Sequence, residues 1–184
     1  MQLDEPYTFK TKAQTLVHLQ NRLDCAVIPN LYVFSVKDWT EDRAGCLYFI
    51  HRYFRNFIVV RSSTTSEDNQ ISSGAGEFDS ILNVDPKDQV AITDAIDKVI
   101  EAYSKKITSD YLLGQEILIQ DMIDNVSMSG VAFTCEVKTG SPYYVINYDD
   151  VTGRTDTVTA GEGEYSNRTL YVYKDSVSSL RSRR

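Results

Sequence analysis

A loop rich in hydroxyl groups follows a buried strand and an arginine in the stretch IVVRSSTTSEDNQISSGAGEF, residues 58–78. The guanidinium of Arg61 offers a planar fork that matches phosphate oxygens. Four hydroxyl residues follow it at 62–65, and the glycines of Gly74-Ala75-Gly76 let backbone N–H groups approach an anion closely. These residue types predict an anion-binding loop. The alternative is a surface loop whose serines and threonines cap turns, since no GxxxxGK[ST] or GxGxxG motif is present.

The bulk composition predicts a folded, acidic protein. The chain has 184 residues, 42% of them hydrophobic, and a formal net charge of −7. Such a charge disfavours a surface for nucleic acid or anionic membrane, because phosphate binding needs a dense basic face. The basic run Arg181–Arg184 is interpreted as a frayed end.

The cysteines and the apolar runs favour a cytoplasmic protein. The three cysteines at positions 25, 46 and 135 are far apart and form no CxxC pair, which predicts free thiols in a reducing compartment. No apolar run approaches the roughly 20 residues of a membrane helix. The N-terminal sequence MQLDEPYTFK lacks the features of a signal peptide.

The hydrophobic pattern predicts a mixed first half and a strand-rich second half. Apolar residues three or four apart indicate helices over residues 11–23, 42–54 and 88–107, and Thr11 can cap the first. Apolar runs indicate strands over residues 31–36, 57–60 and 79–84. Later runs indicate a largely antiparallel series of strands over residues 116–123, 129–137, 143–149, 156–161 and 169–174. We therefore predict an α+β fold with two lobes, residues 1–110 and 111–184.

Several short blocks also follow the order of a known family signature. Arg61-Ser-Ser, Glu67-Asp68, Ser73 to Gly76 and Leu82-Asn-Val84 resemble the pattern VRSS…ED…SxAG…LNV. The segment KTKAQTL around Lys12 is similar to a GGKGANL-like first helix, and the segments 117–123 and 129–134 are similar to VQxMV…SGVAFT. All these patterns belong to the N-terminal nucleotide-binding domain of the pyruvate phosphate dikinase and phosphoenolpyruvate synthase family, and the blocks run from about residue 9 to residue 161.

The resemblance implies an ATP-grasp fold that binds Mg-ATP between two lobes. It further implies that a phosphoryl group passes to a histidine on a separate domain, and that a third domain then uses it on pyruvate. Phosphoryl transfer mainly needs positioning and the neutralisation of negative charge. By resemblance, Lys12 and Arg61 contact the ATP phosphates, although Lys12 taken alone also fits a solvated helix lysine. The remaining nucleotide contacts implied are the covering loop of Ser73, Gly74, Ala75 and Gly76 and the adenine-facing hinge of Gln120, Asp121, Met122 and Ile123.

The segment that would hold the metal departs from the family pattern. The family has a GLGE-like motif whose glutamate binds Mg²⁺, whereas this chain reads VINYDDVTGRTDTVTAG over residues 145–161. Asp156 falls where that glutamate would be. Asp149 and Asp150 lie nearby in sequence and could supply oxygen ligands to a hard cation. The alternative for these two aspartates is a solvated turn.

Two functional hypotheses follow, with a third, weaker one. Neither His18 nor His51 lies in the family's glycine-rich phosphocarrier motif, so we expect the acceptor histidine on another domain and this chain to be one domain of a larger enzyme, as a fragment or a truncation. The first hypothesis is the ATP-binding domain of a phosphoenolpyruvate synthase-like phosphotransferase. Its final acceptor is left open by the sequence: pyruvate, a glutamine amide, an antibiotic or another compound. The second is a degenerate ATP-grasp domain with a non-catalytic binding or structural role. The third is a generic anion-binding domain without nucleotide specificity.

Overall fold

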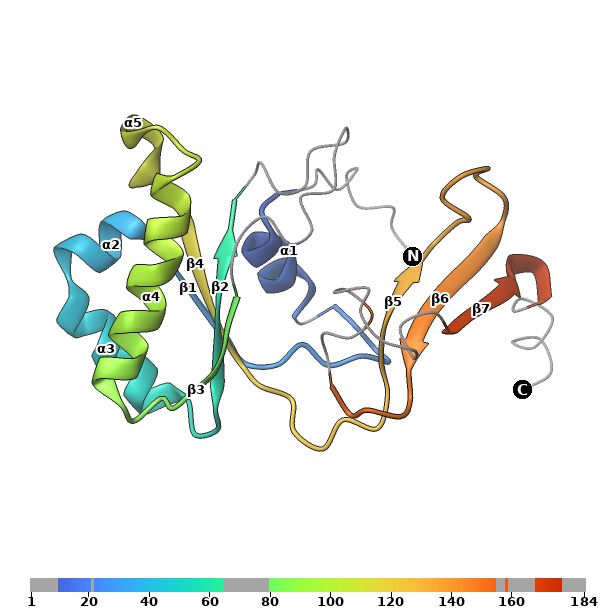
Figure 1. The fold of residues 1–184 in the computed structure, drawn as a ribbon, viewed down its shortest axis with the longest axis horizontal. Helices are drawn as coiled ribbons and strands as arrows, with labels where there is room; N and C mark the ends of the chain where they lie inside the picture. The colour runs from blue at the N-terminus through green and yellow to red at the C-terminus, as the bar shows by residue number, and fades with distance from the viewer. Residues whose placement is uncertain (1–9, 21, 65–79, 155–157, 159–167, 177–184) are drawn as a thin grey trace. The chain divides into compact units, whose positions relative to one another are not determined.

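The structure of the protein is a computed structural model, drawn as a ribbon in Figure 1. It describes residues 10–20, 22–64, 80–154, 158 and 168–176. The chain divides into two compact units, Met1–Met122 and Ile123–Arg184. The sequence placed the boundary between lobes at residue 110. The units divide later because the strand that begins at Glu116 is hydrogen-bonded inside the sheet of the first unit.

The first unit is built on a four-stranded antiparallel sheet with the strand order β1-β4-β2-β3. Its strands are β1 (Leu31–Ser35), β2 (Ile58–Ser63), β3 (Ser80–Val84) and β4 (Glu116–Asp121). The two central strands, β2 and β4, carry the continuous apolar runs IVV and ILI. A strand that is covered on both faces needs such a run, whereas a strand with one wet face alternates apolar and polar residues.

Helices cover both faces of this sheet, as Figure 1 shows. One face carries α2 (Val36–Glu41), α3 (Arg43–Tyr53) and α4 (Gln89–Ser104), and α1 (Lys12–Leu19) lies on the other. A short helix, α5 (Ser109–Leu112), precedes β4. The main core lies beneath α2, α3 and α4, and its largest fully buried side chains are Trp39, Tyr103, Phe54, Ile50, Ile58, Ile92, Ile96, Ile117 and Ile119. The core therefore occupies the face opposite α1.

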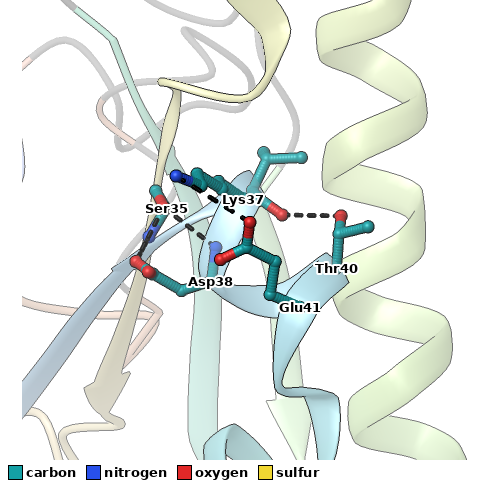
Figure 2. Close-up of polar contacts among 6 residues, drawn as sticks. Ser35, Lys37, Asp38, Thr40 and Glu41 are labelled. Carbon is teal, nitrogen blue, oxygen red and sulfur yellow. Dashed lines mark hydrogen bonds and ion pairs between the residues drawn. The ribbon is translucent and has the colours of Figure 1, made fainter.

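The connection from β1 to α2 needs no loop, because Ser35 ends the strand and caps the helix (Figure 2). The Ser35 hydroxyl accepts a hydrogen bond from the Asp38 N–H at 3.0 Å, and the Asp38 carboxylate accepts one from the Ser35 N–H at 2.8 Å. The hydrogen bonds from Ser35 lower the pKa of Asp38. Lys37 and Glu41 form an ion pair at 3.8 Å one turn apart. This helix was not predicted, since six residues are too few to show a helical period.

One carboxylate joins three helices on the core side. Asp97 of α4 accepts a hydrogen bond from the Trp39 indole at 3.1 Å and pairs with the Arg43 guanidinium at 3.2 Å. The Arg43 guanidinium also lies 4.7 Å from the centre of the Trp39 ring. These contacts fix α2 and α3 against α4.

The second unit contains a three-stranded antiparallel sheet with the order β5-β6-β7. Its strands are β5 (Ser129–Phe133), β6 (Tyr143–Asp149) and β7 (Arg168–Tyr173). The prediction of an antiparallel sheet in this half of the chain is therefore confirmed, except that β4 belongs to the first unit. With its two antiparallel sheets, the protein has an α+β fold.

Glycine at position 130 allows β5 and β6 to pack closely. A Cβ atom on Gly130 would lie 2.3 Å from the Asn147 carbonyl oxygen and 3.1 Å from the Tyr148 Cα atom. These are backbone atoms of the paired strand, so they can move only if the ladder shifts. We therefore expect Gly130→Ala to lower the free energy of unfolding by about 1–3 kcal/mol in urea denaturation followed by circular dichroism.

A matched glycine provides the control for this prediction. A Cβ atom on Gly114 would have the Tyr111 carbonyl oxygen as its nearest neighbour at 3.8 Å, which is an ordinary contact. Gly114→Ala should therefore change the free energy of unfolding by no more than about 0.5 kcal/mol. Equal losses for the two variants would contradict the close approach of β5 and β6.

Most of the other predicted elements agree with the structure to within a few residues. Thr11 caps α1 as predicted, with its Oγ1 atom accepting a hydrogen bond from the Gln14 N–H at 3.1 Å, but α1 ends at Leu19. The helix α5 was not predicted, again because it is short. The strand expected over residues 156–161 falls almost entirely outside the described residues.

The structure also describes the three cysteines and the apolar character of the helices. All three cysteines are free, and burial raises the pKa of the Cys46 thiol, which keeps it protonated. Among the helices in the described part of the chain, none has the length and apolar character to cross a bilayer.

Candidate functional site

Arg61 lies within β2, on the face of the sheet that α1 covers. Successive side chains of a strand point to opposite faces. Val60 belongs to the core beneath α2, α3 and α4, so Arg61 projects to the other side. Ser63 shares that side, and its Oγ atom accepts a hydrogen bond from the Ala13 N–H of α1 at 2.9 Å. The strand ends at Ser63, three residues later than the sequence indicated, and Arg61 is therefore held inside a paired strand.

Glu116 ties the first turn of α1 to the sheet. Its carboxylate accepts hydrogen bonds from the Thr11 hydroxyl and from the Gln14 side-chain amide, both at 2.5 Å. A carboxylate beside the first turn of a helix is also favourable because the N-terminal end carries partial positive charge. Lys12 is the first residue of α1 and is half-buried, so these contacts fix the point from which its side chain extends. Lys12 and Arg61 thus lie on the same side of the sheet.

Tyr103 of α4 contacts the same end of the sheet, where Ser63 and Glu116 lie. Its side chain is fully buried, and its hydroxyl accepts a hydrogen bond from the Ser63 N–H at 2.6 Å. The same hydroxyl donates a hydrogen bond to the Glu116 carbonyl oxygen at 2.5 Å. Tyr103 therefore bridges the paired ends of β2 and β4. From the sequence, Tyr103 was expected only to join an apolar helix face, and no role was expected for Glu116. The one signal for Glu116 is that an acid begins an apolar strand.

The hydroxyl residues after Arg61 are less available to a ligand than the sequence indicated. Ser62, Ser63 and Thr64 are all buried. The Ser63 hydroxyl accepts from the Ala13 N–H and lies 3.4 Å from the Glu116 carboxylate, so the protein itself engages it. The residues of the expected phosphate-covering loop, Ser73, Gly74, Ala75 and Gly76, lie outside the described residues.

Of the four predicted hinge residues, Gln120 lies on the same face as Arg61. Gln120 pairs with Val59 across the ladder, and Arg61 pairs with Leu118, so Arg61 and Gln120 are diagonal neighbours. Diagonal neighbours on one face are about 7–8 Å apart, within reach of long side chains. Gln120 is buried, with 8% of its surface exposed. The ladder register therefore brings together two residues that lie 59 positions apart in the sequence.

The following hinge residues are partly committed to the sheet. The backbone N–H groups of Asp121 and Met122 donate to the carbonyl oxygens of Asn30 at 3.0 Å and Phe57 at 2.8 Å. The Asp121 side chain points to the opposite face from Gln120. Its Oδ2 atom accepts from the Asn30 amide at 2.8 Å, and its buried Oδ1 atom has no hydrogen-bond partner among the described residues. The backbone N–H groups of Asp121 and Met122 are thus already engaged within the first unit.

The turn after β6 is stabilised by Asp149. This residue is only 1% exposed, and its carboxylate accepts hydrogen bonds from the N–H groups of Val151 at 2.8 Å and Thr152 at 3.0 Å. Gly153, in the same turn, has a φ angle of +68°, which glycine adopts without strain. Asp149 is therefore better described as a turn residue than as a metal ligand. The Asp149 side chain is buried, however, and not solvated as the sequence suggested.

The other predicted metal ligands are only partly described. The Asp150 carboxylate forms an ion pair with the Arg168 guanidinium, at the start of β7. Asp156 lies outside the described residues. Within the described ranges, no group of three or more His, Cys, Asp or Glu side chains is placed to hold a metal ion. The Mg²⁺ site inferred from the sequence therefore stays a prediction.

The first unit thus carries a lysine-bearing helix, an arginine and a glutamine on one covered face of its sheet. Residues 49–183 match the family model described as pyruvate phosphate dikinase, AMP/ATP-binding domain, and the chain belongs to this family. The family domain is ATP-grasp-like, and the match confirms the resemblance seen in the sequence. The matched range includes Arg61 and Gln120 but not Lys12. No curated protein matches the chain significantly.

Proposed function

We propose that the chain binds Mg-ATP on the α1 side of its first sheet and starts the transfer of a phosphoryl group to a histidine on another domain. The observation that carries this proposal is the placement of Arg61 and Gln120 on one sheet face, beside the first turn of α1.

The phosphates are assigned to Arg61 and Lys12. Arg61 presents a planar donor fork to phosphate oxygens, and Lys12 adds a point charge from the start of α1. The Glu116 carboxylate is oriented by two hydrogen bonds that it accepts from Thr11 and Gln14 at the start of α1. Of the residues named on this face, Lys12 and Arg61 carry two positive charges against the one negative charge of Glu116, in a chain whose net charge is −7.

The base is assigned to Gln120 and the residues after it. A buried side-chain amide offers both a donor and acceptor, which suits the alternating edge of adenine. Gln120, Asp121, Met122 and Ile123 follow one another directly, so the side chain of Gln120 and the carbonyl groups of Asp121 and Met122 can address one base edge. The loop of residues 73–76 would then cover the phosphates.

The metal is assigned to Asp156, with Asp150 as a second ligand only if its ion pair with Arg168 opens. Mg²⁺ prefers one or two carboxylates together with phosphate oxygens, so this set is chemically adequate. The ion would neutralise the charge that develops on the transferred group. The experiment is a calorimetric titration of ATP with and without Mg²⁺, and of inorganic phosphate alone.

We expect Mg-ATP to bind at least about tenfold more tightly than inorganic phosphate, because only the nucleotide engages Gln120 and the hinge. Asp156→Asn should abolish the gain from Mg²⁺ and leave the affinity for metal-free ATP unchanged. Asp124→Asn, which removes an exposed acid of the same unit, is the matched control and should keep the gain. Equal affinity for ATP and phosphate would favour the generic anion-binding domain instead.

One observation favours a second candidate, a degenerate domain that binds nucleotide without catalysis. Asp150 is paired with Arg168 and Asp149 is consumed by a turn, so two carboxylates near the expected metal are already engaged. This candidate predicts ATP binding that does not depend on Mg²⁺ in either the wild-type protein or the Asp156→Asn variant.

A further inference from the structure

The outward face of α3 exposes an unusual number of aromatic side chains. Tyr48 is 68% exposed, Tyr53 is 54% exposed and Phe49 is 37% exposed, and Phe57 just beyond the helix is 51% exposed. At 100° per residue, Tyr48, Phe49 and Tyr53 span an arc of roughly 140° on one side of the helix. The buried residues Cys46, Leu47 and Ile50 occupy the other side. Adjacent exposed aromatics are uncommon on a monomer and mark interaction sites.

Two of these rings, Phe49 and Tyr53, are held in place by stacking. Phe49 stacks on Tyr32 of β1 with ring centres 4.2 Å apart and on Tyr53 with ring centres 5.0 Å apart. Tyr32 in turn contacts Phe34 at 5.1 Å, and Phe34 is part of the buried core. Phe49 and Tyr53 therefore form the outer end of an aromatic row that begins in the core. Such a surface loses little side-chain entropy when a partner binds.

Arginines flank the same aromatic surface. Arg52 and Arg55 are exposed and make no hydrogen bond or ion pair with the described part of the chain. The sequence contains no aspartate or glutamate from Arg43 to Ser66, although the whole chain carries a net charge of −7. Arg52 also benefits from its place in the last turn of α3, where a cation is favourable. The helix dipole gives no such benefit to Arg55, which lies beyond the end of α3.

From this combination we infer that Tyr48, Phe49, Arg52, Tyr53 and Arg55 form a docking surface for an acidic protein segment that carries an apolar anchor. Tyrosine, phenylalanine and arginine are the residue types enriched at the centres of protein interfaces. The aromatic row offers a site for an apolar side chain. Arg52, which lies within the same arc of α3, and Arg55 just beyond the helix offer donors to carboxylates. The surface lies on the opposite face of the sheet from Arg61, so the inference does not depend on nucleotide binding.

The probe for this surface is a fluorescein-labelled peptide of glutamates and aspartates around a single phenylalanine, titrated by fluorescence anisotropy. The reference probe has every acid replaced by lysine. We expect the acidic peptide to bind at least about tenfold more tightly than the basic one. Arg52→Glu combined with Arg55→Glu should lower the affinity for the acidic peptide by about tenfold or more. Tyr53→Ala should lower it by about fivefold while the far-ultraviolet spectrum stays unchanged.

The matched control is Lys87→Glu combined with Lys98→Glu. Both lysines are exposed on the same unit, and the pair changes the net charge by the same amount. This control should keep the affinity within about twofold of the wild-type value. A loss as large as that of the arginine pair would show that only net charge matters and would overturn the proposal. So would equal binding of the acidic and basic peptides. A reversible dimer in sedimentation velocity that the arginine pair abolishes would also overturn it, in favour of a second copy of this chain as the occupant.

Discussion

Replacement of Arg61 by alanine is expected to weaken ATP binding by about 10- to 150-fold, the range for loss of a hydrogen-bonded charged contact. The expectation is large because Arg61 lies inside a paired strand and starts from a rigid backbone. A side chain on a rigid backbone loses little conformational entropy when it binds a ligand, so most of its contact energy contributes to affinity. Calorimetric titration of Mg-ATP into the two proteins measures the difference.

The companion variants separate charge from geometry. Arg61→Lys keeps the positive charge but loses the planar fork, so we expect an affinity between those of the wild-type protein and the alanine variant. Lys12→Ala should weaken ATP binding by about tenfold, whereas Lys98→Ala, on the outer side of α4, should have no measurable effect. If a folded Arg61→Ala protein bound ATP as tightly as the wild type, the assignment of the phosphates to this face would be refuted.

The second large effect is expected at Tyr103. Replacing it with phenylalanine removes one oxygen atom from a fully buried position and leaves the Ser63 N–H and the Glu116 carbonyl without their partner. Each buried group left unsatisfied costs about 1–3 kcal/mol, so we expect the free energy of unfolding to fall by about 2–4 kcal/mol. Urea denaturation followed by the fluorescence of Trp39, in the same unit, is the appropriate measurement.

An exposed tyrosine supplies the control for this change. Tyr111→Phe removes the same atom from a side chain that is 71% exposed, and the expected change is no more than about 0.5 kcal/mol. Tyr103→Phe should also weaken ATP binding, because Ser63 and Glu116 hold the first turn of α1. A loss of stability no larger than that of Tyr111→Phe would mean that the bridge between β2 and β4 is not needed.

The sequence predicted those parts of the structure that depend on local patterns. Thr11 was identified as a cap because N-capping requires only a hydroxyl residue before an amphipathic run. The helix α4 was identified because four turns of spacing leave little ambiguity, with Ile92, Ile96, Val99 and Tyr103 on its buried side. The family was identified from short blocks in the correct order, and the match over residues 49–183 confirms it.

The parts that the sequence could not predict depend on contacts between distant segments. Nothing in the run EILIQD shows that β4 inserts between β1 and β2, since strand pairing is decided by burial on both faces of the assembled sheet. The common face of Arg61 and Gln120 follows from that register. The role of the Tyr103 hydroxyl was missed because a hydrophobic pattern treats tyrosine as an apolar residue, whereas its polar end found two backbone groups.

The way α1 is held has a dynamic consequence. Hydrogen bonds from Thr11, Ala13 and Gln14 join its beginning to the sheet, while Ala13 is its one fully buried side chain. Such a helix can detach in a local opening that costs far less than global unfolding, and its amides would exchange with deuterium well before those of α4. A nucleotide phosphate bound to Lys12 would add a tie at the same end. Deuterium uptake along α1 should then be slower with bound nucleotide than without it, whereas the uptake of α4 should not change.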